Sequence, residues 1–186
     1  WFKNQCNKNG MIKMSFIPGN SKAKSLAKPN ALTVIKHTQS TTQTITVDNK
    51  VELDTINNWY GSFTPTISSD VITLPSGYFY YIESATQAYT TGGYVYNHVT
   101  SFQHYDETNS AYTGTIGTCA SSYTESLQTF SRDSVARLLV DCSSSSINIS
   151  LKVQDNPGTG HTHVNYNADQ YAYAALGRTV IWQLNT

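Results

Sequence analysis

The stretch LPSGYFYYIESATQ, residues 74–87, decides the fold class of this chain. Successive side chains of a β-strand point to opposite faces of the sheet, so a strand with one wet face alternates apolar and polar residues. Here Tyr78, Tyr80 and Ile82 fall on one face of the strand. Phe79 and Tyr81 fall on the other face. Both faces are apolar, and we therefore expect both of them to be covered.

The rest of the chain also favours β-structure. Short runs rich in β-branched and aromatic residues are separated by Gly, Pro, Asn and Ser, and no convincing helix appears among the 186 residues. This punctuation predicts eight to ten short strands in a sandwich or barrel. The four serines 143–146 predict a hairpin between the runs on either side of them. The β-rich runs are 31–38, 42–47, 49–56, 71–74, 92–105, 134–142, 147–153 and 178–185.

Charge divides the chain into two parts. Only 13% of residues are charged, and 12 basic residues balance 12 acidic ones, so we expect no nucleic-acid partner and no membrane insertion. Residues 1–30 nevertheless contain six lysines and no acid, which leaves six basic and twelve acidic side chains in the remaining 156 residues. We predict an extended, irregular, basic N-terminal arm over 1–30 and one β-sandwich domain over 31–186.

The region 57–87 resembles the middle of a jelly roll of the tumour-necrosis-factor (TNF) and complement-C1q-like family. In that family an Asn-rich turn and a short strand lead to an apolar strand that ends near Pro, and a Gly-x-Tyr-x-Phe-type strand follows. Two features depart from the family pattern. One residue, Ser76, stands where the C1q pattern has two, and the loop 105–128 is longer than the family predicts. The matching residues are Asn57, Asn58, Tyr60, Ile72, Leu74, Pro75, Gly77, Phe79 and Tyr81.

The resemblance implies a compact homotrimer whose Gly-x-Tyr strand lines the threefold axis. One face of that strand would then pack inside the sandwich and the other against two further copies of the chain. We take Tyr78, Tyr80, Ile82 and Trp182 as interface or core candidates, because the sequence fixes the face only to within one residue. Two alternatives stay open: an aromatic platform that stacks on sugars, and a plain core role. The platform candidates are Tyr94, Tyr96 and Tyr105.

Motifs for catalysis and metal binding are weak. There is no GxSxG, phosphate loop or HExxH, so we do not expect an enzyme. The pair His161 and His163 lies two residues apart, and on a strand both imidazoles would point the same way. Three such pairs on a threefold axis would offer an octahedral transition-metal site, and we predict no other cofactor. Cys119 and Cys142 could pair, although three isolated thiols is the simpler interpretation.

These features favour a virion structural protein of a bacteriophage over two other classes of protein. The chain would form a trimeric capsid decoration or attachment knob, or a tail-fibre module, with other virion proteins as partners. The alternatives are a glycan-binding recognition module, such as a fibre tip or a secreted C1q-like lectin, and a monomeric carbohydrate-binding module. In the virion interpretation the arm docks on its partner through lysine charge or apolar anchors. The docking candidates are Phe2, Lys3, Lys8, Lys13, Phe16 and Ile17.

Overall fold

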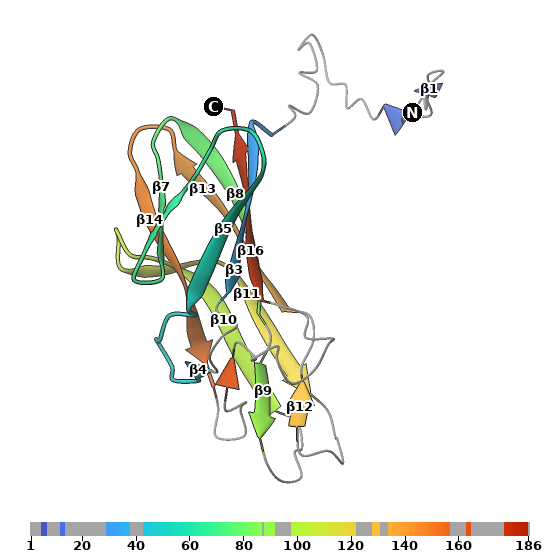
Figure 1. Ribbon diagram of the computed structural model, residues 1–186, viewed down its shortest axis with the longest axis vertical. Helices are drawn as coiled ribbons and strands as arrows, with labels where there is room; N and C mark the ends of the chain where they lie inside the picture. Colours follow the sequence, from blue (N-terminus) through green and yellow to red (C-terminus); the bar gives the residue numbers. More distant parts are fainter. Residues whose placement is uncertain are drawn as a thin grey trace.

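The structure, a computed structural model, is all-β in the residues that it describes. These residues are 5–6, 12–13, 29–37, 43–86, 88–91, 98–121, 128–130, 134–156, 163–164 and 177–185. Two antiparallel five-stranded sheets pack face to face and form an elongated sandwich (Figure 1). This architecture confirms the β-sandwich expected from the sequence. The described residues include no apolar helix long enough to cross a membrane.

The first sheet contains the strand that decided the fold class. That strand is β8, which pairs with β13 on one side and with β16 on the other. In spatial order the strands of this sheet are β13 (Ser134–Cys142), β8 (Tyr78–Thr86), β16 (Arg178–Leu184), β3 (Ala31–His37) and β5 (Leu53–Tyr60).

The second sheet covers one face of the first. Its order is β11 (Ala111–Ser121), β10 (His98–Asp106), β14 (Ile147–Asp155), β7 (Val71–Leu74) and β6 (Thr66–Ser68). A smaller sheet lies at one end of the sandwich, with the order β12 (Gln128–Phe130), β9 (Ala88–Thr91), β15 (His163–Val164) and β4 (Gln43–Thr44) (Figure 1). Within residues 1–30, β1 (Gln5–Cys6) pairs antiparallel with β2 (Ile12–Lys13).

Alternation along β8 separates the core from the opposite face. Tyr80 and Ile82 point into the sandwich and are fully buried, whereas Phe79 and Tyr81 point to the other side and are half-buried. Neighbouring strands follow the same period of two, because cross-strand partners in an antiparallel sheet share a face. The core is therefore formed by every second side chain along the strands of both sheets.

The predicted hairpin around the serines 143–146 is wrong. β13 pairs with β8 in the first sheet, and β14 pairs with β10 and β7 in the second, so the serine turn crosses from one sheet to the other. Both strands have one strongly apolar face, and these two faces meet across the core instead of lying side by side. Periodicity shows which side chains are buried, but it does not show which strand lies beside which.

The long segment after Tyr105, expected to be a loop, contains β11. This strand pairs with β10 through a register shift between Phe102 and His104. Gly114 lies in the shifted part with a φ of +76°, and a Cβ there would lie 2.3 Å from the carbonyl oxygen of Arg137. The close approach explains why glycine interrupts the strand pattern, and the interruption concealed the strand in the sequence.

Candidate functional site

The first sheet presents an apolar surface on the side that faces away from the core. The strand register aligns its side chains in rows, because Tyr81 lies opposite Leu139 on one neighbour and opposite Trp182 on the other. We call this surface the open face. Its apolar members are Leu32, Val34, Trp59, Phe79, Tyr81, Ala85, Val135, Leu139, Val180, Trp182 and Leu184.

Large apolar side chains on the open face are poorly covered. Leu139 exposes 65% of its surface and Trp59 exposes 71%. The rings of Tyr81 and Trp182 pack against each other with centroids 5.3 Å apart, which fixes both rings at the centre of the face. Contiguous exposed apolar surface on a folded domain usually marks a place where another molecule binds.

An ion pair lies beside this aromatic pair. Arg137 Nε donates to Glu83 Oε1 at 2.9 Å, and the Tyr81 hydroxyl donates to the same oxygen at 2.8 Å. Burial by itself would raise the pKa of Glu83, but the hydrogen bonds from Tyr81 and Arg137 outweigh that effect and lower it. The carboxylate is therefore ionised and partnered at neutral pH, so it can be covered by another apolar surface at a smaller cost than a lone charge.

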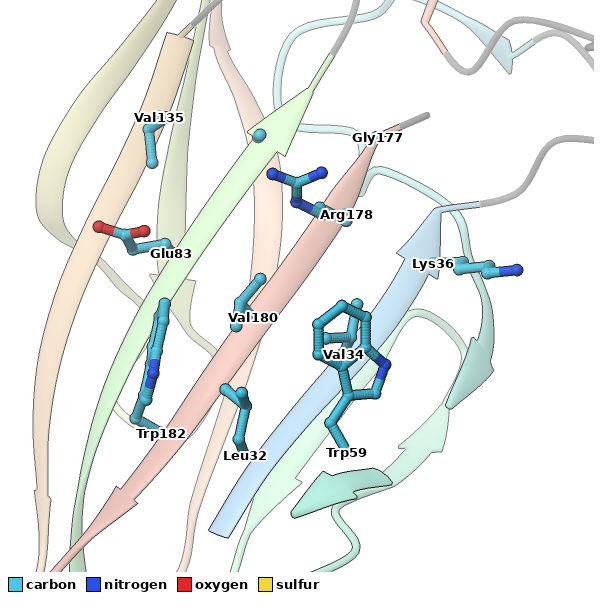
Figure 2. A pocket seen from close by; sticks show the side chains of 11 residues that line it. Leu32, Val34, Lys36, Trp59, Glu83, Val135, Gly177, Arg178, Val180 and Trp182 are labelled. Carbon is cyan, nitrogen blue, oxygen red and sulfur yellow. The ribbon is translucent and has the colours of Figure 1, made fainter. Parts of the chain in front are cut away.

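A shallow hollow of about 610 Å³ crosses the open face. Figure 2 shows Trp59 lying over Val34 at one side of this hollow, and Trp182 at the other side. Lys36 and Arg178 lie towards one end, and Glu83 also lines the hollow, so it combines aromatic walls with charges of both signs. Such a surface suits an apolar or aromatic partner better than a catalytic reaction, because no described group in it has the environment of a nucleophile with its base.

Comparison with known proteins identifies the fold. No protein-family model matches the chain, and no curated protein matches it either. Among solved structures it is similar to the Eiger TNF of S. frugiperda, with a TM-score of 0.50 and 10% sequence identity over 86% of this chain and 96% of that chain. The chain has a TNF-like jelly-roll fold. At this identity the likeness shows the fold alone, and it carries no functional residue from one chain to the other.

The TNF-like jelly roll places the four predicted interface or core residues on both faces of the first sheet. Tyr80 and Ile82 belong to the core and are fully buried within one chain, so an interface role for them is wrong. The Tyr80 hydroxyl is accommodated because it donates to the carbonyl oxygen of Pro75 at 3.0 Å. Tyr78 is 36% exposed at the start of β8, and Trp182 lies on the open face. On β8 the open-face residues are therefore the two immediate neighbours of Tyr80.

Tyr105 is a poor candidate for sugar stacking in this fold. Lys152 Nζ lies 3.3 Å from the centroid of its ring, and the ring of Tyr112 packs edge-on at a centroid distance of 5.1 Å. One face of Tyr105 is thus occupied by a cation that Glu107 holds in place, with a distance of 3.2 Å between Lys152 Nζ and Glu107 Oε1. The other two platform candidates, Tyr94 and Tyr96, lie outside the described residues.

Several other predictions also lie where the structure describes little or nothing. His161 is outside the described residues, and His163 is described only as backbone in β15, so the metal site stays a prediction. The part of the chain that the structure describes contains no group of three metal-ligating side chains. Lys13 is described only as backbone in β2, and the other arm candidates, Phe2, Lys3, Lys8, Phe16 and Ile17, lie outside the described residues.

The structure adds open-face residues that the sequence did not single out. Trp59 follows an Asn-rich run at the end of β5, and Leu139 looks like an ordinary member of an apolar strand. A signal for Leu139 was present, because Ala136, Leu138 and Val140 fill one face of β13 and leave Leu139 on the other. Cys119 and Cys142 are both buried and form no disulfide with each other, which answers the question of their pairing.

Proposed function

We propose that this chain is a non-catalytic structural protein that assembles as a homotrimer through its open face. The observation that carries the proposal is the second apolar face of the first sheet, with Trp59 and Leu139 mostly exposed and Tyr81 packed on Trp182. A homotrimer is also what the TNF-like fold family implies. Two further copies of the chain would cover this surface, because aromatic side chains bury much area at a small entropic cost.

Light scattering tests the homotrimer. We expect the purified chain to have three times the monomer mass, and the Leu139→Glu variant to be a folded monomer. Leu139 is exposed in the single chain, so the glutamate costs little there, whereas burying its unpaired charge between subunits costs several kcal/mol, roughly, per copy.

Ile116→Glu is the matched control for that variant. Ile116 is 51% exposed and lies on β11, which belongs to the second sheet and not to the sheet that forms the open face. We expect this variant to remain trimeric. A wild-type chain that is monomeric at micromolar concentration, or a trimer that both variants disrupt equally, would contradict the proposal.

We further propose that the trimer is a component of a virion, such as a capsid decoration knob or a tail-fibre module. Support comes from the low content of charged residues, the absence of catalytic motifs, and a basic segment 1–30 that precedes the first long strand. Deletion of residues 1–30 should leave the trimer intact and abolish attachment to the particle. Retention of attachment after this deletion would assign docking to the sandwich instead.

A second candidate function is glycan binding at the hollow of the open face. Trp59 favours it, because this ring is 71% exposed, faces Trp182 across the hollow, and lies near the cations of Lys36 and Arg178. Sugars stack on such rings and accept hydrogen bonds from cationic side chains. Glycan binding by a monomer that is lost in Trp59→Ala would favour this function over the trimer interface.

A further inference from the structure

Four polar side chains form a continuous buried chain between the two sheets. His37 Nε2 lies 3.0 Å from Thr179 Oγ1, and Thr179 Oγ1 lies 2.7 Å from Ser84 Oγ. Ser84 Oγ lies 2.9 Å from Nε2 of His104, which belongs to the second sheet. Each of the four side chains exposes 2% of its surface or less. We call these four residues the polar layer.

The polar layer lies between two separate apolar clusters of the core. Along β8 the inward side chains are Tyr80 and Ile82, then Ser84, then Thr86, and after the end of the strand Ala88. The first cluster consists of Ala31, Ile35, Phe63, Ile72, Leu74, Tyr80, Ile82, Leu138, Val140, Cys142, Ile149 and Ile181. The second cluster consists of Ile45, Val51, Ala88, Phe102, Cys119, Ala136, Leu151 and Val153.

The hydrogen bonds of the polar layer fit two neutral imidazoles. Nε2–H of one ring can donate to the nearer hydroxyl, that hydroxyl can donate to the next, and the last hydroxyl can donate to the bare Nε2 of the other ring. A proton added to the accepting ring makes both Nε2 atoms donors, and one hydroxyl proton then has no acceptor inside the layer. In addition, Nδ1 of both His37 and His104 is buried without a hydrogen-bond partner among the described residues.

Nothing charged in the described interior could stabilise a protonated ring. No Asp, Glu, Lys or Arg is buried among the described residues. Lys36, Glu83 and Arg178, on the strands that carry the layer, belong to the open face, and Arg137 of β13 pairs with Glu83 there. On the neighbouring strands of the other sheet and on β5, Lys152, Tyr105, Glu107, Tyr112 and Asp54 are half-buried or exposed. The other titratable side chains of the two apolar clusters are Tyr80, Cys119 and Cys142.

Burial accordingly disfavours the charged form of both histidines. Desolvation, together with the nearby His104, lowers the pKa of His37 from 6.5 to about 3. Desolvation lowers the pKa of His104 from 6.5 to about 4. When a histidine is neutral while buried and charged while exposed, lowering the pH favours the form of the chain in which it is exposed. The population of that form rises by up to about tenfold for each pH unit below the ordinary pKa of histidine.

We propose that the polar layer is an acid-sensitive joint between the two halves of the core. At neutral pH it connects the first and second clusters into one sandwich. When the histidines gain protons, the half built on the second cluster opens while the half built on the first stays folded. The joint belongs to the single chain, so it is independent of how the open face is covered.

The buried cysteines provide one probe in each half. Cys119 belongs to the second cluster and Cys142 to the first, and both are fully buried. In the full chain carrying Cys6→Ser, the two thiols are labelled with dithiodipyridine, a reagent that also reacts with thiols in acid. The labelling rate of each thiol is compared between neutral pH and about pH 4.5. We expect Cys119 to react at least about 10-fold faster in acid, after correction for the intrinsic rate, and Cys142 to stay protected. The proposal is wrong if acid accelerates the labelling of both thiols equally, or if it accelerates the labelling of neither.

Two substitutions test whether the layer itself causes the response. His104→Gln retains an amide that can bond to Ser84 but gains no charge, so the acid acceleration at Cys119 should fall about 10-fold or more. Ser84→Ala removes the central hydroxyl and should accelerate labelling of Cys119 already at neutral pH, with Cys142 still protected. Glu107→Gln, on the outer surface, is the control and should behave as the wild type. If His104→Gln shows the same acid acceleration of Cys119 labelling as the wild type, the proposal is wrong. If that variant does not fold, a labelling rate of Cys119 at neutral pH that is unchanged in Ser84→Ala contradicts the proposal instead.

Discussion

The Tyr80→Ala variant should lose about 3–5 kcal/mol of unfolding free energy, the range for removal of a large buried aromatic side chain. The ring is fully buried and lies 5.1 Å from the ring of Phe63, measured between centroids. Its hydroxyl donates to the carbonyl oxygen of Pro75 and lies 3.4 Å from the Gln183 amide nitrogen, so the truncation also leaves the buried Gln183 amide without this partner. Urea unfolding followed by circular dichroism measures the loss.

Tyr81→Ala is the matched control, because the same residue type at the next position of β8 points to the open face. Its ring packs on Trp182 and its hydroxyl donates to Glu83, but both contacts lie at the surface of the single chain. We expect a loss of about 1 kcal/mol or less in the unfolding of the monomer, together with weaker association. If Tyr81→Ala were the more destabilising of the two in the monomer, the assignment of the two faces of β8 would be reversed.

This pair of variants addresses what the sequence could and could not predict about β8. The alternation of Tyr78, Tyr80 and Ile82 with Phe79 and Tyr81 is a property of the strand, so the division into two apolar faces followed from the letters alone. Which of the faces packs inside the sandwich depends on β10 and β14, strands far along the chain. The sequence therefore predicted two apolar faces correctly and left open which of them packs in the core.

Pairing between strands was the least predictable part of the fold. The hairpin expected at the serines 143–146 failed because the turn joins two sheets, and β11 was missed because Gly114 and Gly117 interrupt its pattern. In both places the sequence carries a local signal for burial or for a turn. The partner across the sheet is a non-local choice, set by register shifts and by the second sheet.

The polar layer was missed for a related reason. The inward positions of β3 are Ala31, Thr33, Ile35 and His37, so His37 continues an alternating pattern that marks it as buried. Serine, threonine and histidine at such positions look like the ends of strands when each strand is considered alone. Only the packing of β8 and β16 against β10 brings His104 to them and makes a single hydrogen-bonded chain.

The two histidines lead to a second large effect, a steep loss of stability in mild acid. Their pKa values in the folded chain, about 3 for His37 and about 4 for His104, lie below the 6.5 of the unfolded chain. Below about pH 6.5 the unfolded chain therefore binds more protons than the folded chain. Stability is complete above about pH 6.5 and falls, as the pH decreases towards the folded values, by up to about 2.7 kcal/mol per pH unit for two histidines.

The histidine effect can be separated from that of the carboxylates by the pH at which each begins. For Glu83 and Glu107, burial acts to raise the pKa, but hydrogen bonds and nearby cations lower it overall. Their contribution is lost only as the pH falls through the range below their ordinary value of 4.5. The interval from about pH 6.5 to about pH 5 thus reports on the histidines.

Urea unfolding at several pH values across that interval measures the slope. We expect His104→Gln to reduce it to about 1.4 kcal/mol per pH unit, because one histidine remains to take up a proton. Glu107→Gln should leave the slope unchanged. Stability that is flat across this interval in the wild type would mean that the buried rings are already charged in the folded chain or gain their protons without opening it, and the polar layer would then be a structural contact without acid sensitivity.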